Sequence, residues 1–375
     1  MNILYFFQEI GTPMFQWQRV HIINELEQHG CQVTTFNPLH YATPVEANDA
    51  VLMQMRNCRY DLFFTNVGYY KVLFPETVEQ IKKMGIPTLC LRCDNLVIPF
   101  NDKVLAPHFD LVWLTAIETK YLYDHWGVKS FFAPYAANPF VFQSGSDGQN
   151  IRKVCFIGTP YGSRSIMINS LSRGCISVDA YYKKTESVVA QQPSDSAIKS
   201  NLIWPSRVSV VLHRLQFPAG RKMMLGMIVN KLKGQVRIEE NKNLSSLPVV
   251  LPDEQGAIYS RYALCLASTS TNHTDVLKNP LKIVNLRNFE IPMSGGIEIC
   301  KYNPELADYF EDGKEIIFYQ DNDELVDKAR YYIQKATDYE LNAIKLAARK
   351  RAEAEHTWWN RFTKAFDILG IHYEL

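Results

Sequence analysis

The sequence predicts an α/β protein with two domains, each built around a parallel β-sheet. Residues 3–36 form an apolar run, a helical pattern and a second apolar run, the opening strand–helix–strand unit of such a sheet. Residues 143–150 are polar, contain glycine and lack periodicity, so they are the best candidate linker. A new strand and a glycine-bearing loop follow over residues 154–164. With 375 residues, the chain is long enough for two cores.

The composition is that of a globular protein, with 47% hydrophobic and 21% charged residues. The net charge of +1 gives no overall reason to expect a nucleic-acid partner. The N-terminus lacks the positive region and cleavage site of a secretory signal, and no stretch reaches about 18 uninterrupted apolar residues. A cytoplasmic location is therefore expected.

The first half continues the alternation of strands and helices. After the strand at residues 3–7, a loop covers 8–15, a helix is expected at 16–29, and Gly30 ends it before a strand at 33–36. Further strands are expected at 61–68, 87–95, 109–115 and 129–139, with helices at 75–84 and 118–126. The fingerprint G-x-G-x-x-G is absent, so a nicotinamide dinucleotide is not indicated.

Asp94 lies at the carboxyl end of the fourth predicted strand. Open α/β sheets place ligands at that edge, so this carboxylate is a candidate general base or ligand of an acceptor hydroxyl. The alternative is that Asp94 and Asn95 only form a turn. Both interpretations remain open at this point.

The second half begins with a strand at residues 154–157 followed by Gly158, Thr159, Gly162 and Arg164. A strand that leads through glycines into a helix can hold phosphate with backbone N–H groups and the helix N-terminus. Arg164 could add a bidentate cationic contact. The pattern by itself is weak evidence for a phosphate site, because it is not a Walker loop. Its position at the start of the second domain supports the interpretation.

Residues 199–242 form a basic segment with nine Lys or Arg against two Glu. Two helical patterns in it, residues 207–217 and 220–234, mix this charge with apolar residues. A basic amphipathic pair can lie on an anionic membrane surface, which would suit an enzyme with a lipid-linked acceptor. The alternative is a pair of core-packing helices with a basic solvated face.

A predicted helix starting near Lys282 ends at Gly295 and Gly296, where glycine tolerates backbone angles that other residues avoid. Glu290 is a carboxylate just inside this helix, and the glycines would let backbone approach a ligand. This order suits a sugar-diol site, while the alternative is an ordinary helix end with surface charges. Four apolar residues share one face at helical spacing, namely Ile283, Leu286, Phe289 and Met293.

The remaining pattern alternates again, with helices at 253–259, 304–310 and from about Asp323, and strands at 262–269 and 315–319. Asp321 and Asp323 spell D-x-D, a potential metal ligand pair, but their position predicts that Asp323 is a helix N-cap. A long helical pattern at 340–367 is interrupted near His356.

Three segments together resemble the C-terminal domain of group-1-like glycosyltransferases, the subgroup that includes spore-maturation-type enzymes. They are NLRNFEIPMSGGIEI (285–299), NPELADYFEDGKEIIFYQDNDELVDKARYYI (303–333) and EHTWWNRF (355–362). The resemblance implies the GT-B fold: two Rossmann-like domains that face each other across a cleft, with a C-terminal helix returning to the N-terminal domain. It places an acceptor-binding domain at 1–142, a nucleotide-sugar-binding domain at 151–350, with the basic helical insertion at about 199–242, and the returning helix at 351–375.

The resemblance also implies roles for individual residues. Glu290 matches the glutamate that binds the donor ribose, and Lys282 replaces the family's other glutamate, which normally contacts the donor sugar. The donor-binding candidates are Gly158, Thr159, Arg164, Asn272, His273, Lys282, Asn285, Arg287, Glu290, Gly295 and Gly296. The loop after the first strand would help to bind the acceptor, through Gln8, Gly11 and Thr12.

The expected reaction moves a sugar from a nucleotide-diphosphate sugar to a glycan, lipid-linked or protein acceptor, in bacterial surface polysaccharide or glycoconjugate synthesis. Arg164, Arg287 and a helix N-terminus would stabilise the leaving diphosphate, so neither a metal nor a cofactor is expected. The resemblance favours retention, with Asp94 as the base if the enzyme inverts. Peripheral contact with the inner face of a membrane would run through residues 199–242. The alternatives are a nucleotide-sugar epimerase of the same fold and a non-catalytic glycan- or nucleotide-binding protein.

Overall fold

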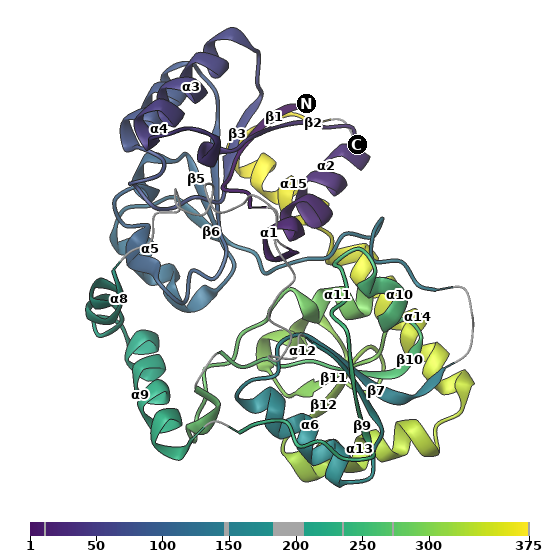
Figure 1. Cartoon of the computed structure of the whole chain (residues 1–375). Coiled ribbons are helices and arrows are strands. Elements are labelled where there is room, and N and C mark those ends of the chain that lie inside the picture. The colour runs from purple at the N-terminus through teal and green to yellow at the C-terminus, as the bar shows by residue number, and fades with distance from the viewer. Residues whose placement is uncertain (11–12, 146–149, 183–205, 235, 272–273, 374–375) are drawn as a thin grey trace. The chain divides into compact units, whose positions relative to one another are not determined.

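The computed structural model describes residues 1–10, 13–145, 150–182, 206–234, 236–271 and 274–373 (Figure 1). The chain divides into two compact units. The N-terminal unit comprises residues 1–134, 191–221 and 358–375, and the C-terminal unit comprises 135–190 and 222–357. No helix within the described ranges has the length and apolar character needed to cross a bilayer.

The N-terminal unit is built on a six-stranded parallel sheet in the order β2-β1-β3-β4-β5-β6. The central strands are buried throughout, as expected for a parallel sheet covered on both faces. All six strands lie within or next to the predicted ranges. They are β1 (Asn2–Phe6), β2 (Gln32–Phe36), β3 (Leu62–Thr65), β4 (Thr88–Arg92), β5 (Leu111–Leu114) and β6 (Ser130–Phe132).

Helices connect these strands, and two of them differ from expectation. The helix predicted at 16–29 contains a π-helical turn, Arg19–Ile23, between α1 (Pro13–Gln18) and α2 (Asn24–Gln28). A helix that was not predicted, α3 (Pro44–Asn57), begins where the Thr43 hydroxyl accepts from Glu46 N. Among the described residues of this unit, the other α-helices are α4 (Pro75–Lys83), α5 (Lys120–His125), α8 (Arg207–Arg214) and α15 (Trp358–Leu369).

The C-terminal helix α15 is part of the N-terminal unit (Figure 1). Trp358 and Phe362 are buried, and their rings lie 5.7 and 5.4 Å from the ring of Trp113 on β5. The backbone N–H of Trp359 donates to Glu25 Oε1 at 2.7 Å. Aromatic burial therefore holds the end of the chain against the first sheet, as the predicted fold class requires.

The C-terminal unit has a second six-stranded parallel sheet, in the order β12-β11-β10-β7-β8-β9. Two of its strands, β8 and β9, had no recognised sequence pattern, and β9 has the sequence LSSL, with two polar residues. The strands are β7 (Ile151–Ile157), β8 (Val178–Tyr181), β9 (Leu244–Leu247), β10 (Tyr262–Leu266), β11 (Glu298–Lys301) and β12 (Ile317–Tyr319).

The prediction that a helix starts near Lys282 is wrong, because α11 covers only Arg287–Met293. Ile283 N donates to Thr269 O at 2.7 Å, so the chain is still extended there. The helix starts after Asn285, whose Oδ1 accepts from Arg287 N at 3.1 Å. Gly295, with φ +67, follows the helix end as predicted.

The remaining α-helices in the part of the chain that the structure describes are α6 (Ser163–Arg173), α9 (Pro218–Lys233), α10 (Gln255–Tyr259), α12 (Pro304–Tyr309), α13 (Asn322–Gln334) and α14 (Asp338–Glu355). The N-cap of α13 is Asp321 and not Asp323, because Asp321 Oδ1 accepts from Asp323 N and Glu324 N. The predicted interruption near His356 separates α14 from α15.

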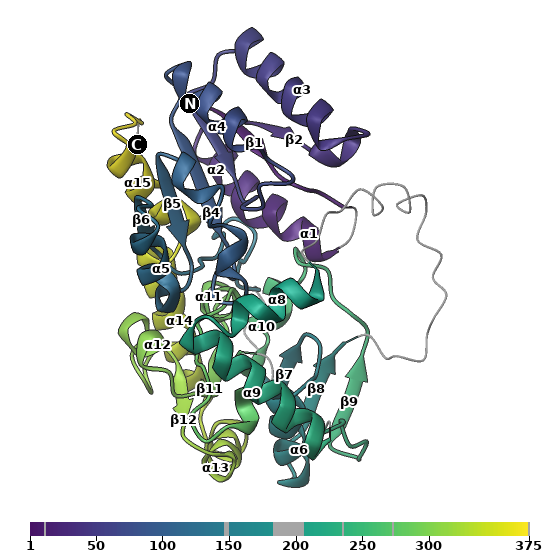
Figure 2. The same ribbon diagram turned by 90° about the vertical axis from the view of Figure 1, so that its left-hand side faces the viewer.

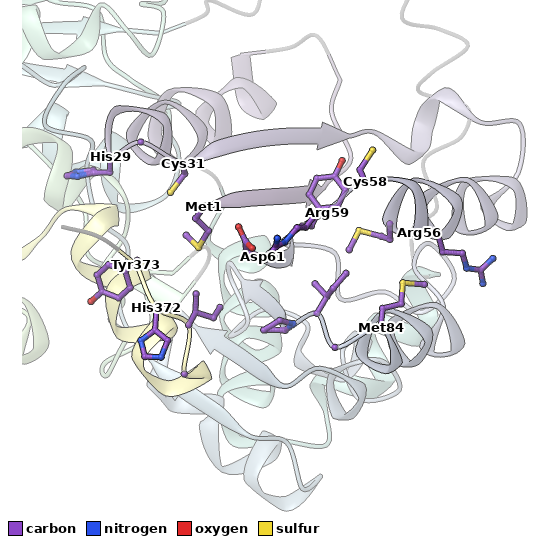
Figure 3. Close-up of a pocket in the computed structure, with 18 of the residues that line it drawn as sticks. Met1, His29, Cys31, Arg56, Cys58, Arg59, Asp61, Met84, His372 and Tyr373 are labelled. Carbon is purple, nitrogen blue, oxygen red and sulfur yellow. The ribbon is translucent and has the colours of Figure 1, made fainter.

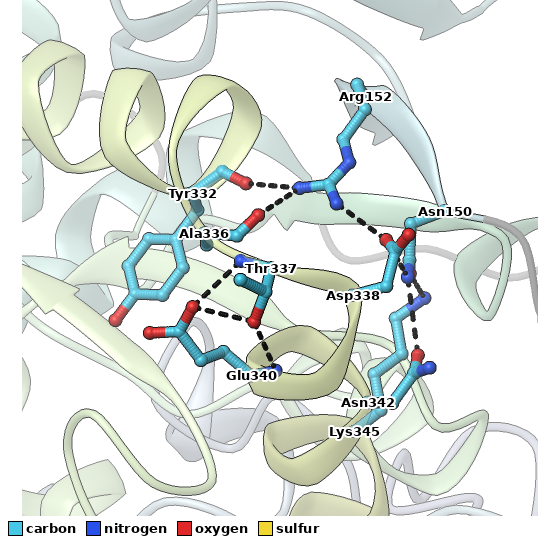
Figure 4. Close-up of polar contacts among 9 residues, drawn as sticks. All are labelled: Asn150, Arg152, Tyr332, Ala336, Thr337, Asp338, Glu340, Asn342 and Lys345. Atoms are coloured by element: carbon cyan, nitrogen blue, oxygen red, sulfur yellow. Dashed lines mark hydrogen bonds and ion pairs between the residues drawn. The ribbon is translucent and has the colours of Figure 1, made fainter.

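Polar contacts fix α14 to the first strand of the C-terminal unit (Figure 4). Arg152 donates to Ala336 O at 2.6 Å and forms a 2.6 Å ion pair with Asp338. The Lys345 ammonium donates to Asn150 Oδ1 at 2.7 Å. These contacts anchor the chain directly after the predicted linker, of which residues 146–149 lie outside the described part.

Candidate functional site

The strand–loop–helix predicted to hold phosphate is present in the C-terminal unit. Strand β7 ends at Ile157, and α6 begins at Ser163 with Gly162 at its N-cap. Gly162 has φ +57, a backbone conformation that favours glycine. Ser163 N donates to Asp275 Oδ2 at 3.3 Å, so a carboxylate lies at the helix N-terminus, where negative charge is favoured.

Two arginines lie at this loop. A methyl group added at Gly158 would be 3.2 Å from Arg287 Nη2, so the Arg287 guanidinium packs directly on the glycine. Arg164 Nη1 donates to Thr159 O at 3.3 Å, and its guanidinium lies 4.6 Å from the centre of the Tyr161 ring. The fold thus brings a residue of α11 and a residue of α6 to the carboxyl end of β7.

The electrostatics of the two arginines differ. Burial and the neighbouring Arg287 charge lower the pKa of Arg164. Burial also acts to lower the pKa of Arg287, but the Tyr259 hydroxyl and the Glu290 carboxylate more than offset it, so that the pKa of Arg287 is raised. Like charges in a partly desolvated site favour binding of an anion that can neutralise both.

Glu290 lies one helical turn after Arg287, so the two side chains share a face of α11. It is buried, with 6% of its surface exposed. Asn285 has a structural role, since its Nδ2 donates to Ser268 O at 2.6 Å and its Oδ1 accepts from Arg287 N at 3.1 Å. This pair of contacts positions the first turn of α11 and with it Arg287.

The other predicted donor residues lie elsewhere in the unit. Lys282 Nζ donates to Tyr302 O at 2.8 Å, beyond the end of β11. Gly295 packs near Ser144, and a methyl group at Gly296 would meet Tyr259 O at 3.1 Å, so both glycines serve close packing at the far end of α11. Asn272 and His273 lie outside the described residues.

Asp94 follows β4, which ends at Arg92 rather than at residue 95 as predicted. Its side chain is exposed and its φ is +53, a strained conformation for a residue other than glycine. Asn95 is buried, and its Oδ1 accepts from Thr115 N and Ala116 N at 3.0 and 2.9 Å. The predicted turn is therefore present, and it presents the Asp94 carboxylate at the carboxyl edge of the sheet. Gln8 follows β1 at the same edge, whereas Gly11 and Thr12 are outside the described residues.

A buried ion pair supports this turn. Arg92 Nη2 lies 2.7 Å from Asp102 Oδ1, and Asp102 is fully buried and accepts a hydrogen bond from the Tyr123 hydroxyl. A methyl group on Gly68 would come within 2.2 Å of Asp102 Oδ1, so only glycine fits there. No local sequence pattern joins these residues, and sequence reasoning missed them.

Sequence reasoning also missed Tyr161, Tyr259 and Asp275 in the C-terminal unit. Of these three residues, Tyr161 could have been found from the sequence, because an aromatic ring three positions before Arg164 can stack on the guanidinium. Asp275 reaches Ser163 from 112 residues away along the chain, a pairing that only the fold creates. No group of three or more His, Cys, Asp or Glu side chains in the described ranges could hold a metal ion.

A cavity of about 1110 Å³ lies at the opposite edge of the first sheet (Figure 3). Met1, Cys31, Asp61 and Pro87, which line it, precede β1, β2, β3 and β4. It is thus at the amino ends of the strands, whereas open α/β sheets bind ligands at the carboxyl ends. We do not assign it to the candidate site.

Comparisons with known proteins relate part of the chain to a family and the whole chain to a fold. Residues 225–367 match the family model described as glycosyl transferase-like. Solved structures with the same fold include HepE of Anabaena in complex with UDP and glucose (11% identity, TM-score 0.56). Another is sucrose-phosphate synthase of Thermosynechococcus elongatus (11%, 0.54), and a third is an α-glucosyltransferase in complex with UDP and DNA (13%, 0.59). Each comparison covers 99% of both chains.

The chain has the GT-B fold, and its residues 225–367 are similar to the glycosyl transferase-like family. The comparison with curated protein sequences gave no match. Two six-stranded parallel sheets with flanking helices are the two Rossmann-like domains of this fold, which confirms the predicted fold class. Of the predicted site residues, the structure brings together Gly158, Thr159, Arg164, Arg287 and Glu290.

Proposed function

We propose that this protein is a glycosyltransferase that uses a nucleotide-diphosphate sugar as donor and a glycan, lipid-linked or protein acceptor. The observation that carries the proposal is the contact of Arg287 with Gly158 beside Arg164, at the carboxyl end of β7. Two guanidiniums at a glycine loop suit the two phosphates of a nucleoside diphosphate. Structures of HepE in complex with UDP and with UDP-glucose support a donor of this class.

In the proposed reaction, the bond between the anomeric carbon of the sugar and the diphosphate oxygen breaks, and the oxygen of an acceptor hydroxyl forms the new bond. The hydroxyl proton passes to the departing diphosphate in retention, or to Asp94 if the enzyme inverts. Arg164 and Arg287 stabilise the charge that accumulates on the diphosphate, without a metal or a further cofactor. Glu290 accepts hydrogen bonds from the ribose hydroxyls. Retention is the favoured outcome, and Asp94 is the candidate base if the enzyme inverts.

The proposal includes a cytoplasmic role in bacterial surface polysaccharide or glycoconjugate synthesis, and peripheral contact with a membrane through residues 199–242. A lipid-linked acceptor would bring the two features together. Acceptor contacts would come from the loop after β1, which contains Gln8.

A thermal-shift screen of the full chain against nucleoside diphosphates and nucleotide-sugars, with and without a chelator, tests the donor. A ligand that binds only the folded state raises the melting temperature. A rise with one nucleotide that the chelator leaves unchanged is expected. No rise with any nucleotide would contradict the proposal and favour the non-catalytic alternative.

Turnover then separates transfer from epimerisation. Release of nucleoside diphosphate that depends on an added acceptor is expected for transfer. Conversion of the donor to a new nucleotide-sugar without any acceptor would instead show the epimerase reaction.

A further inference from the structure

Helix α8 turns its apolar side away from the protein. Val208, Val211, Leu212 and Leu215 are all exposed, and Val208 and Leu212 keep 69% and 57% of their surface accessible. Their spacing of i, i+3, i+4 and i+7 puts them on one face of the helix. A surface helix of a globular protein normally buries that face.

The polar side of α8 faces the N-terminal unit. The His213 ring stacks on Phe100 with ring centres 5.3 Å apart, and Arg214 Nε donates to Val97 O at 3.3 Å. None of the α8 residues is buried. The helix is therefore held by polar and aromatic contacts on its inner side, which leaves the apolar stripe outward.

Helix α9 also exposes apolar side chains. Leu225, Ile228 and Leu232, at i, i+3 and i+7, are exposed, and Leu232 keeps 82% of its surface accessible. Met223 and Gly226 occupy the buried side. Figures 1 and 2 show α8 and α9 as successive helices that follow one another along the chain.

The charge of this segment has one sign. Residues 206–238 contain seven Lys or Arg and no Asp or Glu. Lys231 and Lys233 are exposed in the last turn of α9, next to Leu232. Exposed leucines flanked by lysines, in a segment without acidic residues, are typical of a helix that lies in the headgroup region of an anionic bilayer.

We infer that α8 and α9 are each a binding surface for anionic lipid. Leu212 and Leu232 enter the boundary between headgroups and acyl chains, while Lys231 and Lys233 contact lipid phosphates. This deepens the membrane contact of the proposed function by naming the leucines that insert and the lysines that contact the phosphates. The biological purpose of this lipid binding rests on the proposed function. The binding itself does not, since it needs no sugar donor.

Two other occupants fit this surface less well. A second copy of the chain would bring seven cations against seven cations in a symmetric contact, and like charges oppose that association. A nucleic acid would satisfy the cations but leave the leucine faces in water, because backbone phosphates offer no apolar surface.

The test is cosedimentation of the full chain with vesicles of phosphatidylcholine alone and of equal parts phosphatidylcholine and phosphatidylglycerol. Binding is expected only to the anionic vesicles. Leu212→Ser and Leu232→Ser should each weaken vesicle binding about tenfold or more, because each removes a leucine side chain that the bilayer would bury. Lys231→Ala and Lys233→Ala should each weaken it about fivefold.

Matched controls lie on α14. Leu346 is also an exposed helical leucine, with 71% of its surface accessible, and Lys350 is an exposed lysine. Leu346→Ser and Lys350→Ala should bind anionic vesicles like the unmodified protein. Unchanged melting temperatures would show that all these variants fold.

Several results would overturn the inference. Equal binding to both vesicle types would remove the lipid-charge requirement. Unchanged vesicle binding in both leucine variants would show that the protein is held only by non-specific charge attraction. Absence of vesicle binding, with dimers in light scattering that Leu232→Ser disrupts, would identify a copy–copy interface instead. Because nucleotide thermal shifts are measured without vesicles, failure here is distinguishable from failure of the proposed function.

Discussion

The guanidinium of Arg287 occupies the space that a side chain at Gly158 would need. A methyl group at Gly158 would lie 3.2 Å from Arg287 Nη2 and 3.4 Å from Arg287 Cζ. The glycine also has φ +137, which L-residues rarely adopt. The loop after β7 and the first turn of α11 are thus fitted to each other, so a change in one displaces the other.

Gly158→Ala should weaken donor binding and lower stability. The backbone strain costs about 1–3 kcal/mol, and the added methyl pushes Arg287 out of position. We expect a lower melting temperature and a donor KM raised roughly tenfold, which corresponds to about 1.4 kcal/mol. Gly313→Ala is the control, because Gly313 has φ +76 but nothing within 4 Å of the added methyl. A donor KM raised equally in both variants would mean that strain alone is responsible.

Arg164→Met should reduce nucleoside diphosphate binding about tenfold to a hundredfold, because a charge-assisted hydrogen bond contributes about 1.5–3 kcal/mol. The substitution also removes the repulsion between Arg164 and Arg287, so the ligand-free protein should not be destabilised. Isothermal titration with UDP, GDP and ADP measures the effect. Arg173→Met, at the exposed end of the same helix, is the control and should bind normally. Equal affinities in the two variants would exclude Arg164 from the phosphate site.

Glu290→Ala should raise the donor KM with little change in kcat, since the proposed contact to the ribose is made equally in the ground and transition states. Inorganic pyrophosphate supplies a control ligand because it has no ribose. Its affinity should be the same in Glu290→Ala and in the unmodified protein. If Glu290→Ala lowers the affinity for the donor and for pyrophosphate equally, Glu290 acts by holding Arg287, its neighbour on α11.

The sequence was sufficient to predict most strands, helices and turns in their order along the chain. It was not sufficient to predict contacts between residues that are distant in the sequence. The β7 loop and the end of α11 at Gly295 follow from local glycine chemistry, and both were predicted. The Arg287–Gly158 contact joins two segments with no local pattern in common, so periodicity could not reveal it. The start of α11 was misplaced because Ile283 fits the helical spacing although its backbone pairs with Thr269. Strand β9 was missed because LSSL carries no strong strand signal.

Glu298→Gln should make stability less dependent on pH. Burial raises the pKa of Glu298 from 4.5 to about 7, partly offset by hydrogen bonds from Asn288 and Cys300 and by the Arg287 charge. The folded state therefore holds a proton that the unfolded state has released between about pH 4.5 and pH 7. The free energy of unfolding falls by up to about 3 kcal/mol over that range, and the full loss persists above it.

The glutamine variant lacks this ionisation. The difference in free energy of unfolding between Glu298→Gln and the unmodified protein should therefore favour the variant more at about pH 8 than at about pH 5. Urea unfolding at both pH values measures this difference. Glu353→Gln, at an exposed ion pair with Arg349, is the control and should show the same small difference at both pH values. If Glu298→Gln behaves like this control, Glu298 does not titrate in this range.

Asp94→Asn decides the role of the Asp94 carboxylate. Asn tolerates the left-handed conformation that Asp94 adopts at φ +53, so the turn and the Asn95 contacts should survive. If the enzyme inverts with Asp94 as base, kcat should fall about a hundredfold to ten-thousandfold, while the thermal shift produced by the donor stays unchanged. Asp94→Gly supplies a second variant that lacks the carboxylate and relieves the strain, and it should be more stable by about 1 kcal/mol. Near-normal turnover in both variants would assign Asp94 to the turn alone and leave retention without a protein base as the mechanism to pursue.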